Sequence, residues 1–316
     1  MPAIAVLVEN MKEHQLERIR NALPGWELLY GEDLTGDEVR RAEIVAGWRE
    51  WAEKAVLDPA SRCKWVQTWS AGVDRLPLGQ MLERGIVVTT ASGVHAYPIS
   101  ETIFAMLLAL TRNLHVYIRN QLKRTWDRGG LRLEMHGKTI GIVGVGDIGE
   151  ETARIAKAFG MTVIGVRRSA LPSPHVDRMV GPGALREVLP LCDYVVVTVP
   201  ATPETRHMFD EPEFSAMKPG AFFVNIGRGA TVRTEALLAA LRSGRLAGAG
   251  LDVFEEEPLP PDHPLWQMDN VIITPHSSGF TEHYNDRALD IFVENAAAYL
   301  AGKPLPLNVV EASKLY

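Results

Sequence analysis

A glycine-rich turn between an apolar run and an amphipathic stretch constrains the fold of this chain more than any other feature. Residues 144–149 read Gly-Val-Gly-Asp-Ile-Gly, directly after the apolar residues 140–143 and before a helical pattern over 148–159. In that context the first glycine permits a tight turn, the second lets the backbone approach a pyrophosphate, and the third lets helix and strand pack closely. Free N–H groups at the helix start favour phosphates. We therefore expect a dinucleotide site here rather than a purely structural turn. The residues expected at the phosphates are Gly144, Gly146, Asp147, Ile148 and Gly149.

Short apolar runs rich in Val and Ile recur along the chain, with helical patterns between many of them. Runs without polar alternation are typical of a parallel sheet that is covered on both faces, so the sequence predicts an α/β fold. One long helix is expected over 99–121, and a last helix from Thr281. Expected strands lie at 3–8, 27–30, 43–46, 65–69, 87–89, 139–143, 162–166, 194–199, 221–225, 248–253 and 271–274.

Length and composition limit the classes of protein to consider. The chain has 316 residues, about twice the usual length of one domain, so two domains are expected. Its formal net charge of −6 argues against a nucleic-acid partner. The first residues read as a strand rather than a signal peptide, and the longest helical apolar run is too short for a bilayer. With only two cysteines, a cytoplasmic protein without membrane partners is expected. No cluster has the spacing of metal ligands, so no metal is expected.

The residues after the second strand of the dinucleotide site indicate which nucleotide binds. An NAD site usually has an acidic residue about 20 residues after the glycine turn, which accepts hydrogen bonds from the ribose hydroxyls. Here the strand 162–166 is followed by Arg167, Arg168 and Ser169. Arginine offers no acceptor to a free ribose but pairs well with a 2′-phosphate. We therefore predict NADP(H) as the preferred cofactor and keep NAD(H) as the alternative. The competing interpretation is that the arginines form a solvated strand end.

Three polar segments follow apolar strands at the edge where open α/β sheets place ligands. They contain Arg228, Glu257 and His276. An arginine can hold a carboxylate with two hydrogen bonds and polarise a neighbouring carbonyl. Histidine is the natural proton carrier near neutral pH. A carboxylate behind it would fix its tautomer and favour the imidazolium, which keeps an acid available for reduction of a ketone.

With these segments, the sequence resembles the D-isomer-specific 2-hydroxyacid dehydrogenase family. The resemblance covers most of the chain, and its motifs together are far more specific than any one alone. The motifs are the glycine turn with 156–161, Thr202-Pro-Glu-Thr205, Met217-Lys-Pro-Gly220, Arg228-Gly, Leu251-Asp-Val-Phe254, Glu257-Pro and Thr274-Pro-His276.

The resemblance implies a role for each matching residue. Arg228 would bind the carboxylate and carbonyl oxygen of the substrate, His276 would be the acid/base, and Glu257 would be its partner. Asp252 would hold the nicotinamide carboxamide. The residues implied as further cofactor contacts are Pro200, Thr205 and Ile226.

A second group of residues would contact the substrate from the other domain. The segment 70–74 reads Ser-Ala-Gly-Val-Asp and resembles the substrate loop of the family, in which the backbone amides of Ala71 and Gly72 would meet the carboxylate. Trp48 follows the strand 43–46, and glyoxylate/hydroxypyruvate reductases that resemble this chain carry an aromatic there. A bulky ring would restrict the pocket to short 2-oxo acids. By contrast, His95, His115 and His136 have no comparable support for a role.

The family also implies two Rossmann-like parallel-sheet domains, with the cofactor domain inserted into a flavodoxin-like substrate domain. The dinucleotide-binding domain would span 98–285, and the substrate domain 1–97 together with 286–316. Closure of the two would bring the catalytic residues against the substrate loop. Members are usually homodimers that pair through their cofactor domains.

The leading interpretation is an NADPH-dependent reductase of small 2-oxo acids, closest to the glyoxylate/hydroxypyruvate reductase type, which would produce D-2-hydroxy acids. Two alternatives remain. One is a nucleotide-sensing protein like the transcriptional corepressors of the same superfamily, which keep the Arg, Glu and His. The other is a dehydrogenase of phosphoglycerate or phosphite type.

Overall fold

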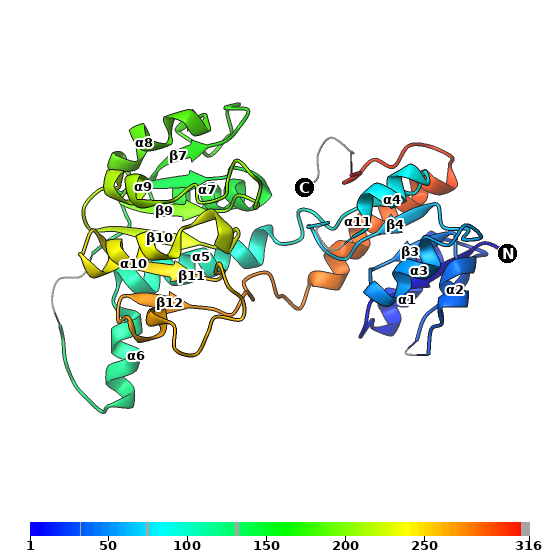
Figure 1. The fold of residues 1–316 in the computed structure, drawn as a ribbon, viewed down its shortest axis with the longest axis horizontal. Coiled ribbons are helices and arrows are strands. Elements are labelled where there is room, and N and C mark those ends of the chain that lie inside the picture. The colour runs from blue at the N-terminus through cyan, green and yellow to red at the C-terminus, as the bar shows by residue number, and fades with distance from the viewer. Residues whose placement is uncertain (32, 74–75, 130–132, 311–316) are drawn as a thin grey trace. The chain divides into compact units, whose positions relative to one another are not determined.

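The chain divides into two compact units that do not follow one another along the sequence. The computed structural model describes residues 1–31, 33–73, 76–129 and 133–310. Unit 1 comprises Met1–Val94 and Thr281–Tyr316, and unit 2 comprises His95–Phe280 (Figure 1). The units therefore divide between residues 94 and 95 and between 280 and 281, whereas the sequence placed these boundaries at 97/98 and 285/286.

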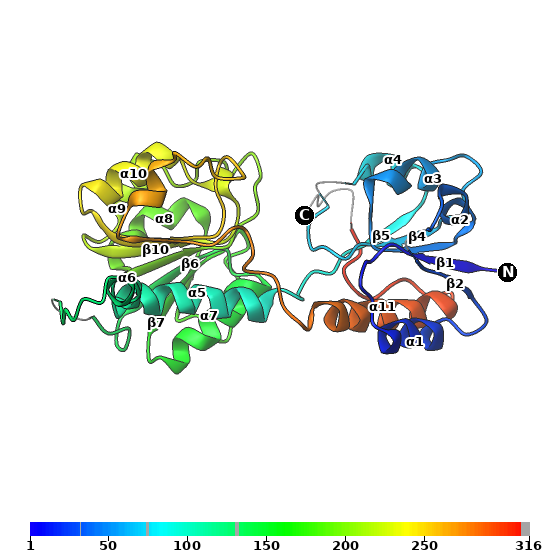
Figure 2. The same cartoon turned by 90° about the horizontal axis from the view of Figure 1, so that it is seen from below.

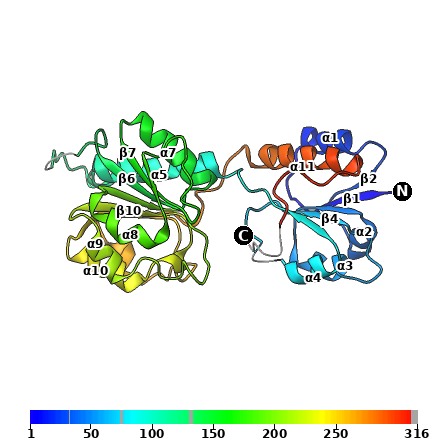
Figure 3. The ribbon, with the colours of Figure 1, turned by 90° about the horizontal axis from the view of Figure 1, so that it is seen from above.

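Unit 1 contains a five-stranded parallel sheet in the order β2-β1-β3-β4-β5. This is the strand order of flavodoxin-like sheets. Helices α1 and α11 cover one face, and α2, α3 and α4 cover the other (Figure 3). The elements are β1 (Ala3–Val6), α1 (Glu13–Ala22), β2 (Glu27–Leu29), α2 (Gly36–Arg41), β3 (Ile44–Ala46), the 3-10 helix Glu50–Ala52, α3 (Glu53–Val56), β4 (Trp65–Gln67), α4 (Leu78–Glu83), β5 (Val87–Thr89) and α11 (Tyr284–Leu300).

The last helix belongs to unit 1 because its apolar face packs on the sheet. The ring of Trp65 in β4 stacks on Phe292 and Tyr299 of α11, with centroid distances of 5.2 and 5.6 Å. Trp65 is completely buried, and its indole N–H donates to Thr89 Oγ1 over 2.7 Å. Aromatic stacking with a satisfied N–H stabilises such a contact beyond its buried area. Residues from both ends of the chain thus share one core.

Unit 2 contains a seven-stranded parallel sheet in the order β12-β11-β10-β9-β6-β7-β8. Numbered within the unit, this gives the 3-2-1-4-5-6 order of dinucleotide-binding folds with one more strand at the edge. The predicted class of two parallel-sheet α/β domains is therefore confirmed. The strands are β6 (Thr139–Val143), β7 (Thr162–Val166), β8 (Arg178–Val180), β9 (Tyr194–Val197), β10 (Ala221–Asn225), β11 (Leu246–Leu251) and β12 (Val271–Ile273). β8 was not predicted from the sequence, because it is short and only partly buried.

Helices cover both faces of this sheet. α5, α6 and α7 lie on one side, and α8, α9 and α10 lie on the other (Figure 2). Their bounds are α5 (Ala96–Thr111), α6 (Leu114–Leu122), α7 (Asp147–Ala158), α8 (Leu185–Val188), α9 (Glu211–Ala216) and α10 (Thr234–Arg242), with 3-10 helices at Pro182–Ala184, Leu189–Leu191, Gly229–Thr231 and Pro264–Gln267.

The prediction of a single helix over 99–121 is wrong. α5 ends at Thr111, and α6 begins at Leu114 after Asn113, whose φ of 55° is left-handed. Asparagine adopts this conformation more readily than most residues, so it ends one helix and starts the next. α5 is largely buried, whereas α6 has no buried residue.

No helix in the described residues is both long and apolar enough to cross a membrane. Within the same residues, no group of three or more His, Cys, Asp and Glu side chains is arranged to hold a metal ion.

Candidate active site

Three neighbouring strands of unit 2 direct the catalytic candidates to one edge of the sheet. β10 pairs in parallel with β11, and β11 with β12. Arg228 follows the carboxyl end of β10, Glu257 lies in the loop after β11, and His276 follows β12. Because the strands are parallel, these three segments leave the sheet at the same edge, as the sequence predicted.

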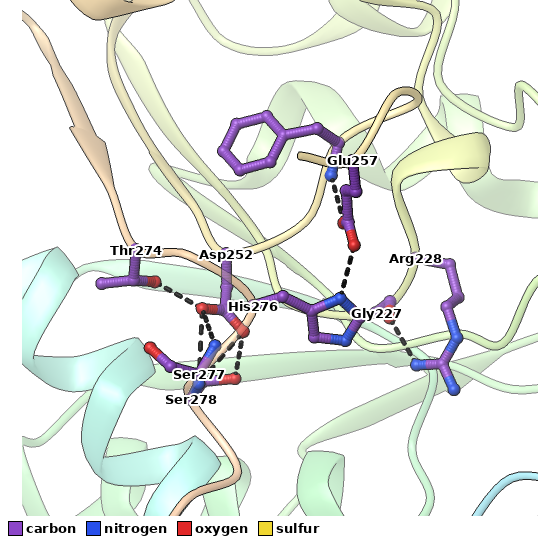
Figure 4. Close-up of polar contacts among 9 residues, drawn as sticks. Gly227, Arg228, Asp252, Glu257, Thr274, His276, Ser277 and Ser278 are labelled. Atoms are coloured by element: carbon purple, nitrogen blue, oxygen red, sulfur yellow. Dashed lines mark hydrogen bonds and ion pairs between the residues drawn. The ribbon is translucent and has the colours of Figure 1, made fainter. Parts of the chain in front are cut away.

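His276 and Glu257 are in direct contact. The imidazole Nδ1 lies 2.7 Å from Oε2 of Glu257, and the other carboxylate oxygen accepts a 2.9 Å hydrogen bond from the backbone N–H of Phe254. Figure 4 shows the imidazole turned toward Glu257 (Figure 4). The carboxylate is therefore fixed by the main chain of its own loop and in turn orients the ring. With Nδ1 on the carboxylate, Nε2 is the nitrogen left to exchange a proton with a substrate.

Asp252 holds the loop that carries His276. It is 1% exposed and accepts 2.5 Å hydrogen bonds from the hydroxyls of Thr274 and Ser278. The N–H groups of Ser277 and Ser278 also donate to it, and the N–H of His276 donates to its main-chain carbonyl over 2.9 Å. His276 itself has a left-handed φ of 51°. A buried carboxylate that accepts so many hydrogen bonds can fix an unusual backbone conformation. Asp252 therefore positions His276.

Arg228 lies in a loop that packs tightly against the loop of Glu257. The main-chain carbonyl of Arg228 accepts from Asn225 Nδ2 over 3.1 Å and from Thr231 Oγ1 over 2.7 Å, and its guanidinium donates to Gly227 O over 2.8 Å. A Cβ on Gly229 would lie 1.8 Å from the carbonyl oxygen of Phe254. Only glycine fits there, so the loops of Arg228 and Glu257 touch backbone to backbone.

His95 lies close enough to Arg228 to feel its charge, a proximity that the sequence did not predict. Its ring lies against Gly279, where an added Cβ would come within 2.7 Å of His95 Cδ2. Burial, with a smaller contribution from the Arg228 charge, lowers the pKa of His95. The lone histidine gave no periodic or motif signal in the sequence, because its surroundings come from segments that are about 130 and 180 residues away.

The glycine turn has the close contacts that its pattern predicted. Gly144 has a φ of 107°, and a Cβ on Gly149 would lie 2.2 Å from the Gly144 carbonyl oxygen. A Cβ on Gly146 would meet no atom within 4 Å, so the backbone there is open to a ligand. α7 begins at Asp147, and the first N–H groups of a helix have no partner within it. The turn, with Asp147, Ile148 and Gly149, fits a pyrophosphate.

The two arginines after β7 have different surroundings. Arg167 donates to the carbonyl oxygens of Val145 and Leu171, over 3.2 and 3.0 Å, and lies 3.3 Å from Glu150. Arg168 and Ser169 are exposed. The pKa of Glu204 is lowered mainly by hydrogen bonds involving Thr202 and the backbone of Glu204, and the charge of Arg168 makes a smaller contribution. Arg167 is thus partly engaged by the protein itself.

The remaining implied cofactor contacts lie after β9 and β10. The hydroxyl of Thr205 donates to the carbonyl of Pro200 over 2.6 Å and accepts from the N–H of Thr202 over 2.8 Å, which closes the loop between β9 and α9. Ile226 is 5% exposed and directly follows β10. Both segments therefore leave the sheet at its carboxyl edge.

The implied substrate contacts in unit 1 also follow strand ends. Trp48 comes two residues after β3, and its indole Nε1 is buried without a hydrogen bond to any described residue. The loop of Ala71 and Gly72 is ordered by Ser70, whose hydroxyl donates to Gly72 O over 2.8 Å. Asp74, the last residue of the expected loop, lies outside the described residues.

Residues 104–278 match the family model described as "D-isomer specific 2-hydroxyacid dehydrogenase, NAD binding domain". The match covers more than half of the chain and includes the glycine turn and all three catalytic candidates. The chain belongs to this family. The resemblance predicted from the motifs is confirmed, and with it an NAD(P)-binding oxidoreductase.

Similar proteins support the same assignment over both units. A "Glyoxylate reductase" of Pyrococcus furiosus is 37% identical over 276 residues, which are 84% of this chain and 81% of that protein. A crystal structure of a D-isomer specific 2-hydroxyacid dehydrogenase family protein from Aeromonas salmonicida has a TM-score of 0.86 and 35% identity, and covers 98% of this chain and 99% of that one. The NADPH-dependent glyoxylate/hydroxypyruvate reductase of Sinorhizobium meliloti, in complex with NADP and sulfate, has a TM-score of 0.78 and 28% identity, and covers 100% of both.

Several residues around the site were missed at the sequence level. Thr274 was recognised only as part of a motif, and the contacts of Ser277 and Ser278 with Asp252 were not predicted. Residue spacing gave no signal for these contacts, because they depend on the left-handed backbone at His276 and on the burial of Asp252. The contacts of Arg167 with Val145 and Leu171 carried no sequence signal, since both acceptors are main-chain carbonyls.

Proposed function

We propose that this dehydrogenase reduces a small 2-oxo acid of the glyoxylate or hydroxypyruvate kind to the D-2-hydroxy acid, with NADPH as the preferred cofactor and NADH as the alternative. The observation that carries the proposal is the 2.7 Å contact between His276 Nδ1 and Glu257 Oε2 at the edge shared with Arg228. The names of similar proteins from Pyrococcus furiosus and Sinorhizobium meliloti support the substrate class.

In the proposed mechanism, the residues of this chain bind the oxo acid and move one proton. Arg228 binds the carboxylate and polarises the carbonyl, and His276 donates the Nε2 proton to the oxygen as the carbonyl is reduced. Glu257 stabilises the positive charge of the imidazolium before transfer. The cofactor supplies the hydride for the carbonyl carbon, so the product gains a C–H and an O–H bond. Trp48, Ala71 and Gly72 are proposed as further substrate contacts.

The cofactor would be held by the glycine turn and by residues at the strand ends. The phosphates would lie at residues 144–149, where the open backbone at Gly146 supports close approach. Arg167, Arg168 and Ser169 are proposed to contact the 2′-phosphate. Asp252 is proposed at the nicotinamide carboxamide, although the described contacts of its carboxylate already fix the loop of His276. The residues proposed near the rest of the dinucleotide are Pro200, Thr205 and Ile226.

We also propose a homodimer that forms through unit 2. On α6 and just after it, four large apolar side chains are exposed, at 52% for Leu114 and Ile118, 81% for Leu122 and 91% for Trp126. The spacing of four residues places Leu114, Ile118 and Leu122 along one face of α6, and Trp126 lies just after the helix. Such an apolar stripe is typical of a protein interface. A cytoplasmic location is proposed as well, supported by two buried free cysteines, Cys63 and Cys192.

The proposal is tested by oxidation of NADPH in the presence of a panel of 2-oxo acids. Turnover should be highest with short, unbranched acids such as glyoxylate and hydroxypyruvate. Turnover only with phosphohydroxypyruvate would favour the phosphoglycerate type. A protein that binds NADPH but turns over no member of the panel would instead be a sensor.

A further inference from the structure

Arg167 connects the glycine turn to the loop that follows β7. One terminal nitrogen of its guanidinium donates to Val145 O in the turn over 3.2 Å, and the other donates to Leu171 O over 3.0 Å. Its Nε is buried and has no hydrogen-bond partner among the described residues. The side chain is 25% exposed. The guanidinium therefore lies beside the nucleotide turn, with its terminal nitrogens engaged by Val145, Leu171 and Glu150 and its buried Nε–H without an acceptor among the described residues.

The carboxylate that faces Arg167 comes from the first turn of the neighbouring helix. Oε1 of Glu150 lies 3.3 Å from a terminal nitrogen of Arg167. Glu150 follows Gly149 directly, and its N–H donates to Gly146 O over 2.8 Å, so it lies in the first turn of α7 beside the glycine turn. Its side chain is 47% exposed. A half-exposed negative charge is thus paired with the arginine that we expect at the 2′-phosphate.

We propose that Glu150 sets the balance between NADPH and NADH because it competes with the 2′-phosphate for Arg167. The inference rests on the proposed cofactor site and deepens it. A 2′-phosphate that binds Arg167 must displace the Glu150 carboxylate from its ion pair with that arginine. The 2′-hydroxyl of NADH carries no charge and can donate a hydrogen bond to a carboxylate, and no acidic residue stands at the strand end. Glu150 therefore disfavours NADPH and tolerates NADH.

The adjacent Glu151 provides a matched control. It lies on the same helix but forms hydrogen bonds of 2.8 and 2.6 Å with Arg154, away from Arg167. Glu150→Gln and Glu151→Gln remove the same charge from neighbouring positions. A general effect of charge at the start of α7 would be similar in both variants, whereas competition for Arg167 would appear only in Glu150→Gln.

The experiment measures dissociation constants of NADPH and NADH by isothermal titration calorimetry on the full chain, so the result does not depend on turnover. Glu150→Gln should shift the ratio of the two constants toward NADPH by about fivefold, and Glu151→Gln should leave it within about twofold. In an Arg167→Gln background, the effect of Glu150→Gln should disappear. Glu150→Ala, with a matching thermal unfolding profile, should shift the ratio in the same direction.

Three outcomes would overturn the inference. They are an unchanged ratio in Glu150→Gln, an equal shift in Glu151→Gln, and a shift that persists without Arg167. The unsubstituted protein tests the cofactor proposal separately. If it binds NADH more tightly than NADPH, the proposed preference fails, while the Glu150 inference is still decided by the change in ratio.

Discussion

Glu257 and His276 form a 2.7 Å contact between Oε2 and Nδ1, although they come from loops after different strands. The N–H of Phe254 holds the second carboxylate oxygen at 2.9 Å. The histidine is therefore oriented by a side chain that the main chain has itself fixed. Each of the first two predictions concerns one part of this arrangement.

Glu257→Gln should lower kcat for 2-oxo acid reduction by about a hundredfold while the dissociation constant of NADPH stays within twofold. The amide can still accept from Nδ1–H, but it no longer stabilises the charged imidazolium. Steady-state kinetics and calorimetry measure the two quantities. Glu256→Gln is the control, because Glu256 is exposed and its substitution removes the same charge from the same loop. Equal kcat values for the two variants would contradict the role of Glu257.

Gly229→Ala should strongly impair both folding and catalysis. The new Cβ would lie 1.8 Å from Phe254 O and 2.5 Å from the N of Glu255, so two backbones must separate. We expect a loss of about 3 kcal/mol in the free energy of unfolding, measured by urea denaturation. Gly183→Ala is the control, since a Cβ there meets no atom within 4 Å. An unfolding midpoint like that of Gly183→Ala would show that the loops are not in contact.

His95 should make the protein less stable as the pH falls. Burial, and then the charge of Arg228, lowers its pKa in the folded state below the ordinary value of 6.5. Below pH 6.5 the unfolded chain therefore binds more protons at this residue, and stability decreases until the pH has passed the folded-state pKa. The stability advantage over His95→Asn should shrink between pH 7.5 and 5.5 in urea unfolding. Parallel profiles of the two proteins would refute this.

The α6 stripe should be required for dimerisation. Ile118→Asp combined with Leu122→Asp should give a monomer in sedimentation equilibrium, because two charges would have to be buried in an apolar contact. Leu191→Asp, also on unit 2 and 46% exposed, should leave the dimer intact. A dimer that survives the double substitution would place the interface elsewhere.

The sequence was sufficient to predict the elements whose signal is local. The apolar strands of unit 2 and the turn at Gly144 follow from residue type and spacing, and the capping box of Asp210 and Glu213 at the start of α9 is also a local pattern. The order of the strands follows from packing and could be expected only through the family. The break at Asn113 was missed because apolar periodicity runs across it.

The candidate site also combines features that the sequence predicts with features that depend on packing. The carboxyl ends of parallel strands meet at one edge, so Arg228, Glu257 and His276 could be expected close together. The contacts of Asp252 with Ser277 and Ser278, the packing of His95 on Gly279 and the pairing of Glu150 with Arg167 depend on how loops fold back. Nothing in residue spacing records such contacts.

The central claim is that His276 supplies the proton for reduction of a 2-oxo acid. The most direct measurement is kcat for NADPH-dependent glyoxylate reduction by His276→Ala, together with the dissociation constant of NADPH. We predict a fall in kcat of at least about a hundredfold with cofactor affinity within twofold of the unsubstituted protein. An unaltered kcat would contradict the account.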